Sequence, residues 1–350
     1  MGVESKYGFA LGRMEKGPRN LITDVEGVRV GHVTLKGGDV HTGVTAVIPH
    51  GGDLFHDKCM AAAHVINGFG KSAGLVQVTE LGTIETPLLL TNTLSVGTAS
   101  TALVQYMLER NQDIGLTTGT VNPLVLECND GSFNDIRGMH VTQAHALEAL
   151  ERADVTFAEG AVGAGTGMTC YSLKGGIGSA SRVFEAYGER YTLGALLLTN
   201  FGSLEDLTVG GEHLGPRLAE LLREEEKPDQ GSVIVILATD APLSDRQLLR
   251  AAKRAQSGLA RTGTISGNGS GEIAVAFTTA NRVPHGPNGK ALSFRQFHDD
   301  DMNLVFRAAI ESVEESVVSS LLHAEHTVGR AGNTRLCLGE LLEREKGLKK

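Results

Sequence analysis

The feature that most constrains the fold is a pair of strongly apolar segments separated by one amphipathic segment. Residues 231–242, GSVIVILATDAP, and residues 271–281, GEIAVAFTTAN, are runs of aliphatic and β-branched residues typical of buried strands. Between them, Pro242 is expected to open a helix over residues 243–262, which ends at a Gly/Ser-rich turn. This order of elements indicates an α/β or α+β fold in which helices cover buried sheets.

The same alternation of strand-like and helix-like segments runs through the rest of the chain. Further strands are expected over 20–35, 43–50, 124–131 and 193–202, and further helices over 92–110, 141–154 and 301–326. Thr91, Asn92 and Thr93 are candidate N-caps of the helix that begins near residue 92. No internal repeat is present, and the polar stretch 223–232, REEEKPDQGS, is the best linker candidate.

Composition narrows the class of protein further. The 350 residues include 45 glycines, which indicates many tight turns and close backbone approaches. The net charge is −9 and the sequence has no basic stripe to neutralise phosphates, so no nucleic-acid partner is expected. The N-terminus lacks the apolar core of a signal peptide, and no apolar run is long enough to span a bilayer.

Four widely separated cysteines form no CxxC pair. They are Cys59, Cys128, Cys170 and Cys337. Disulfide frameworks form in oxidising compartments and show characteristic cysteine spacings, which this chain lacks. The four residues are therefore expected to be free thiols in a reducing compartment. The protein is therefore expected to be cytoplasmic.

One segment carries residues suited to nucleophilic chemistry. In TISGNGSGEIAVAFTTAN, residues 264–281, Ser270 lies between two glycines directly before an apolar strand. Glycines on both sides allow unusual backbone geometry and leave the hydroxyl uncovered, so Ser270 can attack the carbonyl of the preceding peptide bond. Hydrolysis of the resulting ester would free an α-amine with a pKa of about 7.7–8, which can then act as the base for its own side chain. The alternative is an ordinary Gly/Ser hairpin turn.

A series of longer motifs accompanies this segment. They are 20–35, NLITDVEGVRVGHVTL; 80–99, ELGTIETPLLLTNTLSVGTA; 127–131, ECNDG; 159–168, EGAVGAGTGM; 238–243, ATDAPL; 258–263, GLARTG; and 267–281, GNGSGEIAVAFTTAN. In their order and spacing the chain resembles the self-cleaving N-terminal-nucleophile aminopeptidases of the DmpA and β-peptidyl aminopeptidase family. The resemblance extends from about residue 20 to residue 326.

The resemblance implies a cut between Gly269 and Ser270. It would yield an α chain of residues 1–269 and a β chain of residues 270–350, which stay associated as one domain. Ser270 is then the nucleophile.

Two further residues match positions with a role in the family. Asn200 corresponds to the donor that stabilises the oxyanion, and its alternative role is to cap a turn at a strand end. Glu127 corresponds to the acid that holds the free amino group of the substrate, and its alternative is a structural partner.

A Ser-x-Glu pair in the last long helix, Ser312 and Glu314, corresponds to residues that orient the family's nucleophile. Residues two apart on a regular helix point about 200° away from each other. Either the helix is irregular there, or only one of the two reaches the site while Glu314 and Glu315 form a solvated face. A second departure is Ser132, where many relatives have an aromatic residue; here Phe133 follows one position later.

The fold implied is a four-layer α/β/β/α sandwich with the active-site arrangement of an N-terminal-nucleophile hydrolase. The implied reaction removes the N-terminal residue from a short peptide, amide or ester through an acyl-enzyme. No metal or organic cofactor is expected. Relatives of this kind are commonly homotetramers, so a homo-oligomer is expected, with no nucleic-acid or membrane partner.

Other functions compete with this interpretation. The segment 160–167, GAVGAGTG, suggests a dinucleotide site but lacks the full GxGxxG spacing and a following uninterrupted helix. The histidines near residues 50–64 match no metal-binding spacing. Ornithine acetyltransferases are similar in architecture but use a threonine nucleophile, which leaves an acyltransferase as one alternative. An uncut scaffold without enzymatic activity is the other.

Overall fold

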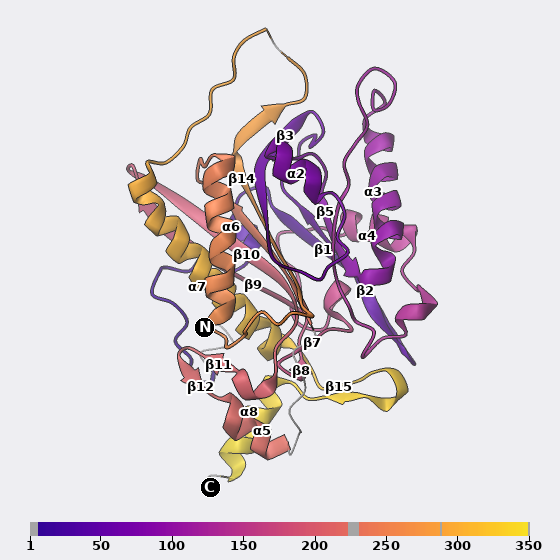
Figure 1. Cartoon of the computed structure of the whole chain (residues 1–350), viewed down its shortest axis with the longest axis vertical. Coiled ribbons are helices and arrows are strands. Elements are labelled where there is room, and N and C mark those ends of the chain that lie inside the picture. The colour runs from indigo at the N-terminus through magenta and orange to yellow at the C-terminus, as the bar shows by residue number, and fades with distance from the viewer. Residues whose placement is uncertain (1–5, 223–230, 288, 349–350) are drawn as a thin grey trace.

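The computed structural model describes residues 6–222, 231–287 and 289–348, and two stacked sheets form its centre (Figure 1). The larger sheet has the strand order β4-β3-β14-β13-β10-β9. Its strands are β3 (Asp57–Gly68), β4 (Thr83–Ile84), β9 (Ile177–Ala186), β10 (Glu189–Asn200), β13 (Ser232–Thr239) and β14 (Gly271–Pro284). The smaller sheet has the order β1-β2-β5-β6. Its strands are β1 (Arg29–Gly37), β2 (Val40–Ile48), β5 (Leu88–Asn92) and β6 (Leu124–Cys128).

Helices cover the outer face of each sheet, which gives the expected α/β/β/α order of layers (Figure 1). Helices α6 (Asp245–Ala260) and α7 (Met302–His323) pack on the larger sheet, and α3 (Val96–Arg110) and α4 (Gln143–Glu151) pack on the smaller one. A short helix, α2 (Leu75–Leu81), follows β3. No helix in the described part of the chain is both long enough and apolar enough to cross a membrane.

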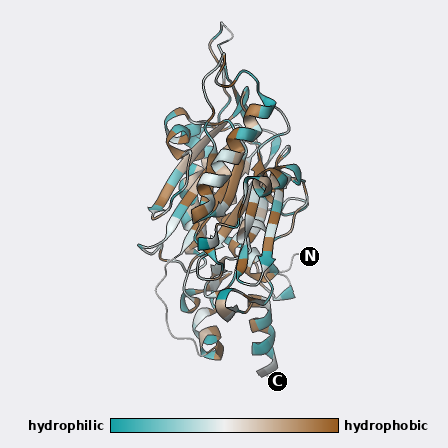
Figure 2. Ribbon diagram, turned by 90° about the vertical axis from the view of Figure 1, so that its right-hand side faces the viewer, coloured by the Kyte–Doolittle hydropathy of each residue, from teal (hydrophilic) through white to brown (hydrophobic). Residues whose placement is uncertain are grey.

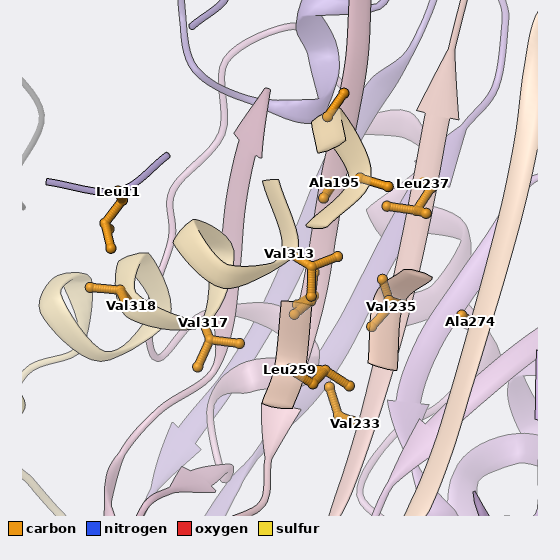
Figure 3. Packing of buried hydrophobic residues seen from close by; sticks show 14 of the residues in the cluster. Leu11, Ala195, Val233, Val235, Leu237, Leu259, Ala274, Val313, Val317 and Val318 are labelled. Atoms are coloured by element: carbon orange, nitrogen blue, oxygen red, sulfur yellow. The ribbon is translucent and has the colours of Figure 1, made fainter. Parts of the chain in front are cut away.

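Successive side chains of a buried strand point to opposite faces of the sheet, which explains how the layers pack together. In β13, Val233, Val235 and Leu237 pack beneath α6 and α7, whereas Ile234 and Ile236 pack between the two sheets. Figure 3 shows the helix side of this arrangement, with Val313 of α7 beside Val235 of β13. Each side chain of this size contributes about 1.5–3 kcal/mol when it is fully buried. Because both faces of the strand are buried, both are apolar. In Figure 2 the strands at the centre of the molecule are accordingly largely brown, the colour of hydrophobic residues.

The remaining elements gather at the end of the molecule where the C-terminus lies (Figure 1). They are α5 (Gly215–Leu222), α8 (Leu338–Leu348), and the short strand pairs β7 (Thr169–Cys170) with β8 (Leu173–Lys174), β11 (Thr208–Val209) with β12 (Glu212–His213), and β15 (Thr327–Val328) with β16 (Thr334–Arg335). Single turns of 3₁₀ helix join several of these elements.

Some boundaries differ from the sequence expectation. Residues 20–28 are not strand, because the Asp24 carboxylate accepts hydrogen bonds from the backbone N–H groups of Arg19 and Leu21 and closes a 3₁₀ turn. Helix α6 begins at Asp245 and not at Pro242, since Ser244 and Gln247 form a capping box there. Residues 223–230 of the predicted linker lie outside the described residues.

The longest strand missed by the sequence analysis is β3. Its sequence, DKCMAAAHVING, contains three consecutive alanines, and alanine favours helix over strand. The tertiary structure overrides that preference, because β3 pairs along β14 and fills the sheet beside it.

Candidate active site

Ser270 directly precedes β14, near the middle of the larger sheet, and its side chain is completely buried. Its hydroxyl Oγ donates a hydrogen bond of 3.0 Å to Oε1 of Glu272, which is equally buried. Residues two apart on a strand share a face, and Ala274 and Ala276 on that face belong to the core beneath α6 and α7. The nucleophile candidate and its carboxylate partner therefore face the helical layer.

The backbone before Ser270 is held by one side chain of β3. Ser270 N–H closes a turn onto the carbonyl of Gly267 at 2.9 Å. The Asn67 amide Nδ2 donates to the carbonyl oxygens of Gly267 and Asn268, at 3.2 Å each, and to that of Ser270. These three carbonyls lie on both sides of the predicted scissile bond, so Asn67 fixes the backbone around it.

Asn200 lies at the end of β10, two strands away from the start of β14. In the sheet register Asn200 is opposite Ser232, and Ser232 is opposite Gly271. Its Oδ1 accepts from the N–H of Thr169 at 3.1 Å, while its Nδ2 donates to the carbonyl of Asn129 at 3.0 Å and to Ser232 Oγ at 3.3 Å. The predicted oxyanion donor is thus in the same row of the sheet as the residue after Ser270.

Glu127 approaches the same region from the smaller sheet, at the end of β6. Its carboxylate accepts from the N–H of Lys71 at 2.7 Å and from the hydroxyl of Thr93. A Cβ added to Gly70 would lie 3.5 Å from Glu127 Oε1 and 3.8 Å from the Cα of Gly271. The carboxylate and the start of the nucleophile strand therefore both border one small space beside Gly70.

Close packing explains a glycine directly after the nucleophile. A Cβ at Gly271 would lie 2.9 Å from the carbonyl oxygen of Phe69 and 3.0 Å from the Cα of Gly70. The segment after β3 therefore passes against the β14 backbone, and any side chain at position 271 would displace it.

Ser312 and Glu314 lie in the uninterrupted helix α7, and among the described residues neither hydrogen-bonds to Ser270. The Ser312 hydroxyl is buried and has no hydrogen-bond partner within this part of the chain. Glu314 pairs with Arg261 at 2.9 Å. The contact with the nucleophile that the sequence analysis gave to this pair is made instead by Glu272.

The expectation that Glu314 and Glu315 form a solvated face of α7 is wrong. Glu314 is 6 % exposed and Glu315 is 2 % exposed. Glu315 forms ion pairs with Lys16 at 2.7 Å and with the fully buried Arg182 at 2.6 Å. Because their charges are paired, the two carboxylates can lie inside although their sequence pattern predicts solvent.

The glycine-rich segment around residues 160–176 packs tightly, and only a 3₁₀ turn, Gly163–Gly165, lies within 160–167. A Cβ at Gly167 would lie 2.1 Å from the carbonyl oxygen of His41, and one at Gly176 would lie 2.0 Å from that of Gly160. The glycines thus allow backbone to meet backbone, and no long helix N-terminus follows to bind a pyrophosphate.

The histidine-rich stretch is likewise accounted for by ordinary contacts. Within the described ranges no three His, Cys, Asp or Glu side chains are grouped to hold a metal ion. His56 bridges Asp53 at 2.6 Å and Asp113 at 2.9 Å, and these hydrogen bonds raise its pKa.

Phe133 lies in the interior of the molecule. It is fully buried and packs edge-on against the ring of His41. Ser132 is exposed, and its carbonyl accepts from Nδ2 of Asn333.

Glu272 and Asn67 are the two site residues that the sequence analysis did not find. Glu272 could have been found, since strand alternation alone places it on the same face as Ser270. Asn67 carried no such signal, because its strand was not predicted.

Comparison with known proteins identifies the family of the chain. Residues 20–335 match the model of peptidase family S58. A β-peptidyl aminopeptidase of Sphingosinicella microcystinivorans is 39% identical over 341 residues, which cover 91% of this chain and 85% of the relative.

Two solved structures share the whole fold. A protein of Pyrococcus horikoshii has 52% identity and a TM-score of 0.92, with 98% of this chain and 99% of that one covered. The L-aminopeptidase D-Ala-esterase/amidase of Ochrobactrum anthropi has 35% identity and a TM-score of 0.89, with 98% of each chain covered. The latter is described as a prototype of the serine aminopeptidases and a variant of the Ntn hydrolase fold.

Proposed function

The chain belongs to peptidase family S58 and is a serine aminopeptidase, and we propose that it matures by cutting its own backbone between Gly269 and Ser270. The products are an α chain of residues 1–269 and a β chain of residues 270–350. Strand β14 pairs with β13 on one side and β3 on the other, so both neighbours hold the new terminus in the sheet after the cut. The observation that carries the proposal is that Ser270, Asn200 and Glu127 all lie at the same end of the two sheets, next to the first residue of β14.

In the mature enzyme Ser270 attacks the carbonyl of the first peptide bond of the substrate. The α-amine of Ser270 takes the hydroxyl proton, since its unperturbed pKa of about 7.7–8 suits a base at neutral pH. The amide NH₂ of Asn200 stabilises the tetrahedral oxyanion, a contribution of about 3–4 kcal/mol. Water then hydrolyses the acyl-enzyme and releases the N-terminal residue.

Glu127 holds the free amino group of the substrate. Its carboxylate is buried and already accepts two hydrogen bonds, so it is fixed in place before a substrate arrives. A buried carboxylate favours a cationic partner, and a blocked N-terminus removes that charge. The specificity for free N-termini follows from this pairing.

Ser312 and Glu314 are proposed, on the family resemblance, to act beside the nucleophile after the cut. The Ser312 hydroxyl, which is buried and has no hydrogen-bond partner within the described residues, can accept a hydrogen bond from a group that maturation brings near it. Arg261 holds Glu314 in a fixed position.

Substrates are short peptides, amides or esters. The relatives named above include a β-peptidyl aminopeptidase and an L-aminopeptidase D-Ala-esterase/amidase, so β-peptides and amino-acid amides are the first compounds to assay. The exposed Ser132, in place of an aromatic residue, favours a different side-chain preference from those relatives. A homotetramer and a cytoplasmic location stay predictions.

Intact-mass analysis of the wild type beside Ser270→Ala tests the proposal. We expect the wild type in two pieces, the smaller one beginning at Ser270, and the variant in one piece. Substitution of Gly269 is expected to stop the cut without unfolding the chain, which circular dichroism would show. A wild type that stays whole after long incubation would overturn self-processing and leave an uncut protein.

A further inference from the structure

Self-cleavage poses a chemical requirement that the mature mechanism does not meet. Before the cut the nitrogen of Ser270 belongs to a peptide bond, so it has no basic lone pair. A serine hydroxyl is a weak nucleophile at neutral pH and needs an adjacent base. The first cut, if it occurs as proposed above, therefore requires a proton acceptor other than the α-amine.

Among the described residues, Glu272 is such a group, in direct contact with the nucleophile. Glu272 Oε1 lies 3.0 Å from Ser270 Oγ and accepts its hydrogen bond. The backbone of Glu272 is opposite Val233 of β13 and Asn67 of β3, so the sheet holds this backbone from both sides. The distance is within the 2.6–3.2 Å that direct proton transfer requires.

The two other acidic residues proposed for the site are placed differently. Glu314 forms an ion pair with Arg261 at 2.9 Å and makes no hydrogen bond to Ser270 among the described residues. Glu127 is held by Lys71 N–H and the Thr93 hydroxyl. We propose that Glu272 is the base of the self-cleavage step, and that the α-amine of Ser270 replaces it in every later turnover.

The step balances with one water molecule. Glu272 takes the proton of the Ser270 hydroxyl as Oγ bonds to the carbonyl carbon of Gly269. The C–N bond to Ser270 then breaks, and the proton passes from Glu272 to the departing nitrogen, which leaves an ester and a free amine. Water hydrolyses the ester to the Gly269 carboxylate and the Ser270 hydroxyl, and Glu272 is again a carboxylate.

The first test measures the rate of cutting from the moment of synthesis. Full-length chains are labelled in a cell-free translation, chased, and sampled for the two products by gel and intact mass. We expect Glu272→Gln to cut at least about 100-fold more slowly than the wild type, since a general base contributes roughly 10²–10⁴ in rate. Glu272→Asp, which keeps a carboxylate, should fall between the two. The matched control is Glu85→Gln. Glu85 is another buried carboxylate, which pairs with Lys58, and it lies before the first residue of β5, at the end of that strand away from the site.

The second test separates proton transfer from positioning. A cysteine thiol has a pKa of about 8.5 and supplies its own thiolate, so it needs a base far less than serine does. In a Ser270→Cys background, Glu272→Gln should therefore slow the cut by less than about tenfold. Thermal melts of Ser270→Ala with and without Glu272→Gln compare folding in two chains that both stay uncut.

The outcomes are distinct. Cutting of Glu272→Gln at the wild-type rate would overturn the assignment, as would an equal loss in the serine and cysteine backgrounds, which would mean a positioning role. Either result leaves the proposed function standing if the wild type cuts and Ser270→Ala does not. A wild type that never cuts would sink the proposed self-processing itself.

Discussion

The backbone N–H of Thr169 donates a hydrogen bond of 3.1 Å to Oδ1 of Asn200, and this contact decides which way the Asn200 amide faces. With its oxygen engaged, the side chain directs its NH₂ group to the Asn129 carbonyl and to Ser232 Oγ. Lys174, buried in the same region, donates to the carbonyl oxygen of Met168, which directly precedes Thr169. The contact therefore fixes which end of the amide donates, and an oxyanion bound by Asn200 takes the place of one of these two acceptors.

Asn200→Ala is expected to lower kcat about 10²–10³-fold with a much smaller change in KM, because the lost donor acts mainly on the transition state. Activity is measured per mole of cut chain. The control is Asn281→Ala, since Asn281 is similarly buried and its Nδ2 donates to two carbonyls, those of Leu243 and Arg295. That variant should lose about 1–3 kcal/mol of stability and keep its kcat. Equal losses of kcat in both variants would contradict the role of Asn200.

Asn67→Ala is expected to slow self-cleavage at least about tenfold, because small displacements of reacting groups carry large rate penalties. The substitution releases the carbonyls of Gly267, Asn268 and Ser270. The appearance of the two products with time is the measurement. Asn122→Ala, which removes a donor to the Gly74 carbonyl, serves as the comparison. Unchanged cutting in Asn67→Ala would show that the turn before Ser270 keeps its conformation without the Asn67 side chain.

Gly70→Ala is expected to lower kcat/KM at least about tenfold for substrates with a free amino group, because the new methyl group enters the space between Glu127 and the start of β14. Folding should be kept, since the nearest atoms to the added Cβ lie at 3.5–3.8 Å, an ordinary contact distance. Steady-state kinetics and a thermal melt measure both effects.

Gly74→Ala, in the same segment, provides the opposite control. Its φ is +93°, and an added Cβ would lie 2.4 Å from the Pro123 carbonyl oxygen. We expect this variant to lose more than about 1 kcal/mol of stability. If Gly70→Ala kept full kcat/KM, the space beside Gly70 would not be where the substrate amine binds.

Lys174 is expected to make stability depend on pH. Burial lowers the pKa of this lysine from 10.5 to about 7, while the unfolded chain keeps the ordinary value. Between about pH 7 and 10.5 the unfolded state therefore binds more protons, and the free energy of unfolding rises with pH by up to about 1.4 kcal/mol per pH unit. Urea unfolding at pH 7, 8 and 9 should show this rise in the wild type and a flatter one in Lys174→Met. Identical slopes would mean that the ammonium stays charged on its three carbonyl acceptors.

Much of the site could be predicted from local pattern. The glycines around Ser270 and the apolar run after it indicated a serine at the start of a buried strand, which β14 is. The predicted N-cap Asn92 does cap the helical turn after β5, where its Oδ1 accepts from Ser95 N–H. By contrast, Glu314 and Glu315 were expected to be solvated, because the sequence alone does not reveal the arginines that neutralise them.

By itself, the sequence determined the alternation of strands and helices, the family motifs and the identity of the nucleophile candidate. These depend on side-chain polarity and backbone freedom over a few neighbouring residues, which a local pattern records. Only the tertiary structure decided that Asn67 donates hydrogen bonds to the turn before Ser270. It also decided that Glu272, and not Glu314, contacts the Ser270 hydroxyl. Asn67 and Ser270 are about 200 residues apart, and only the pairing of β3 with β14 brings them together. Such contacts depend on strand register, which cooperative packing of the two sheets fixes and no short segment encodes.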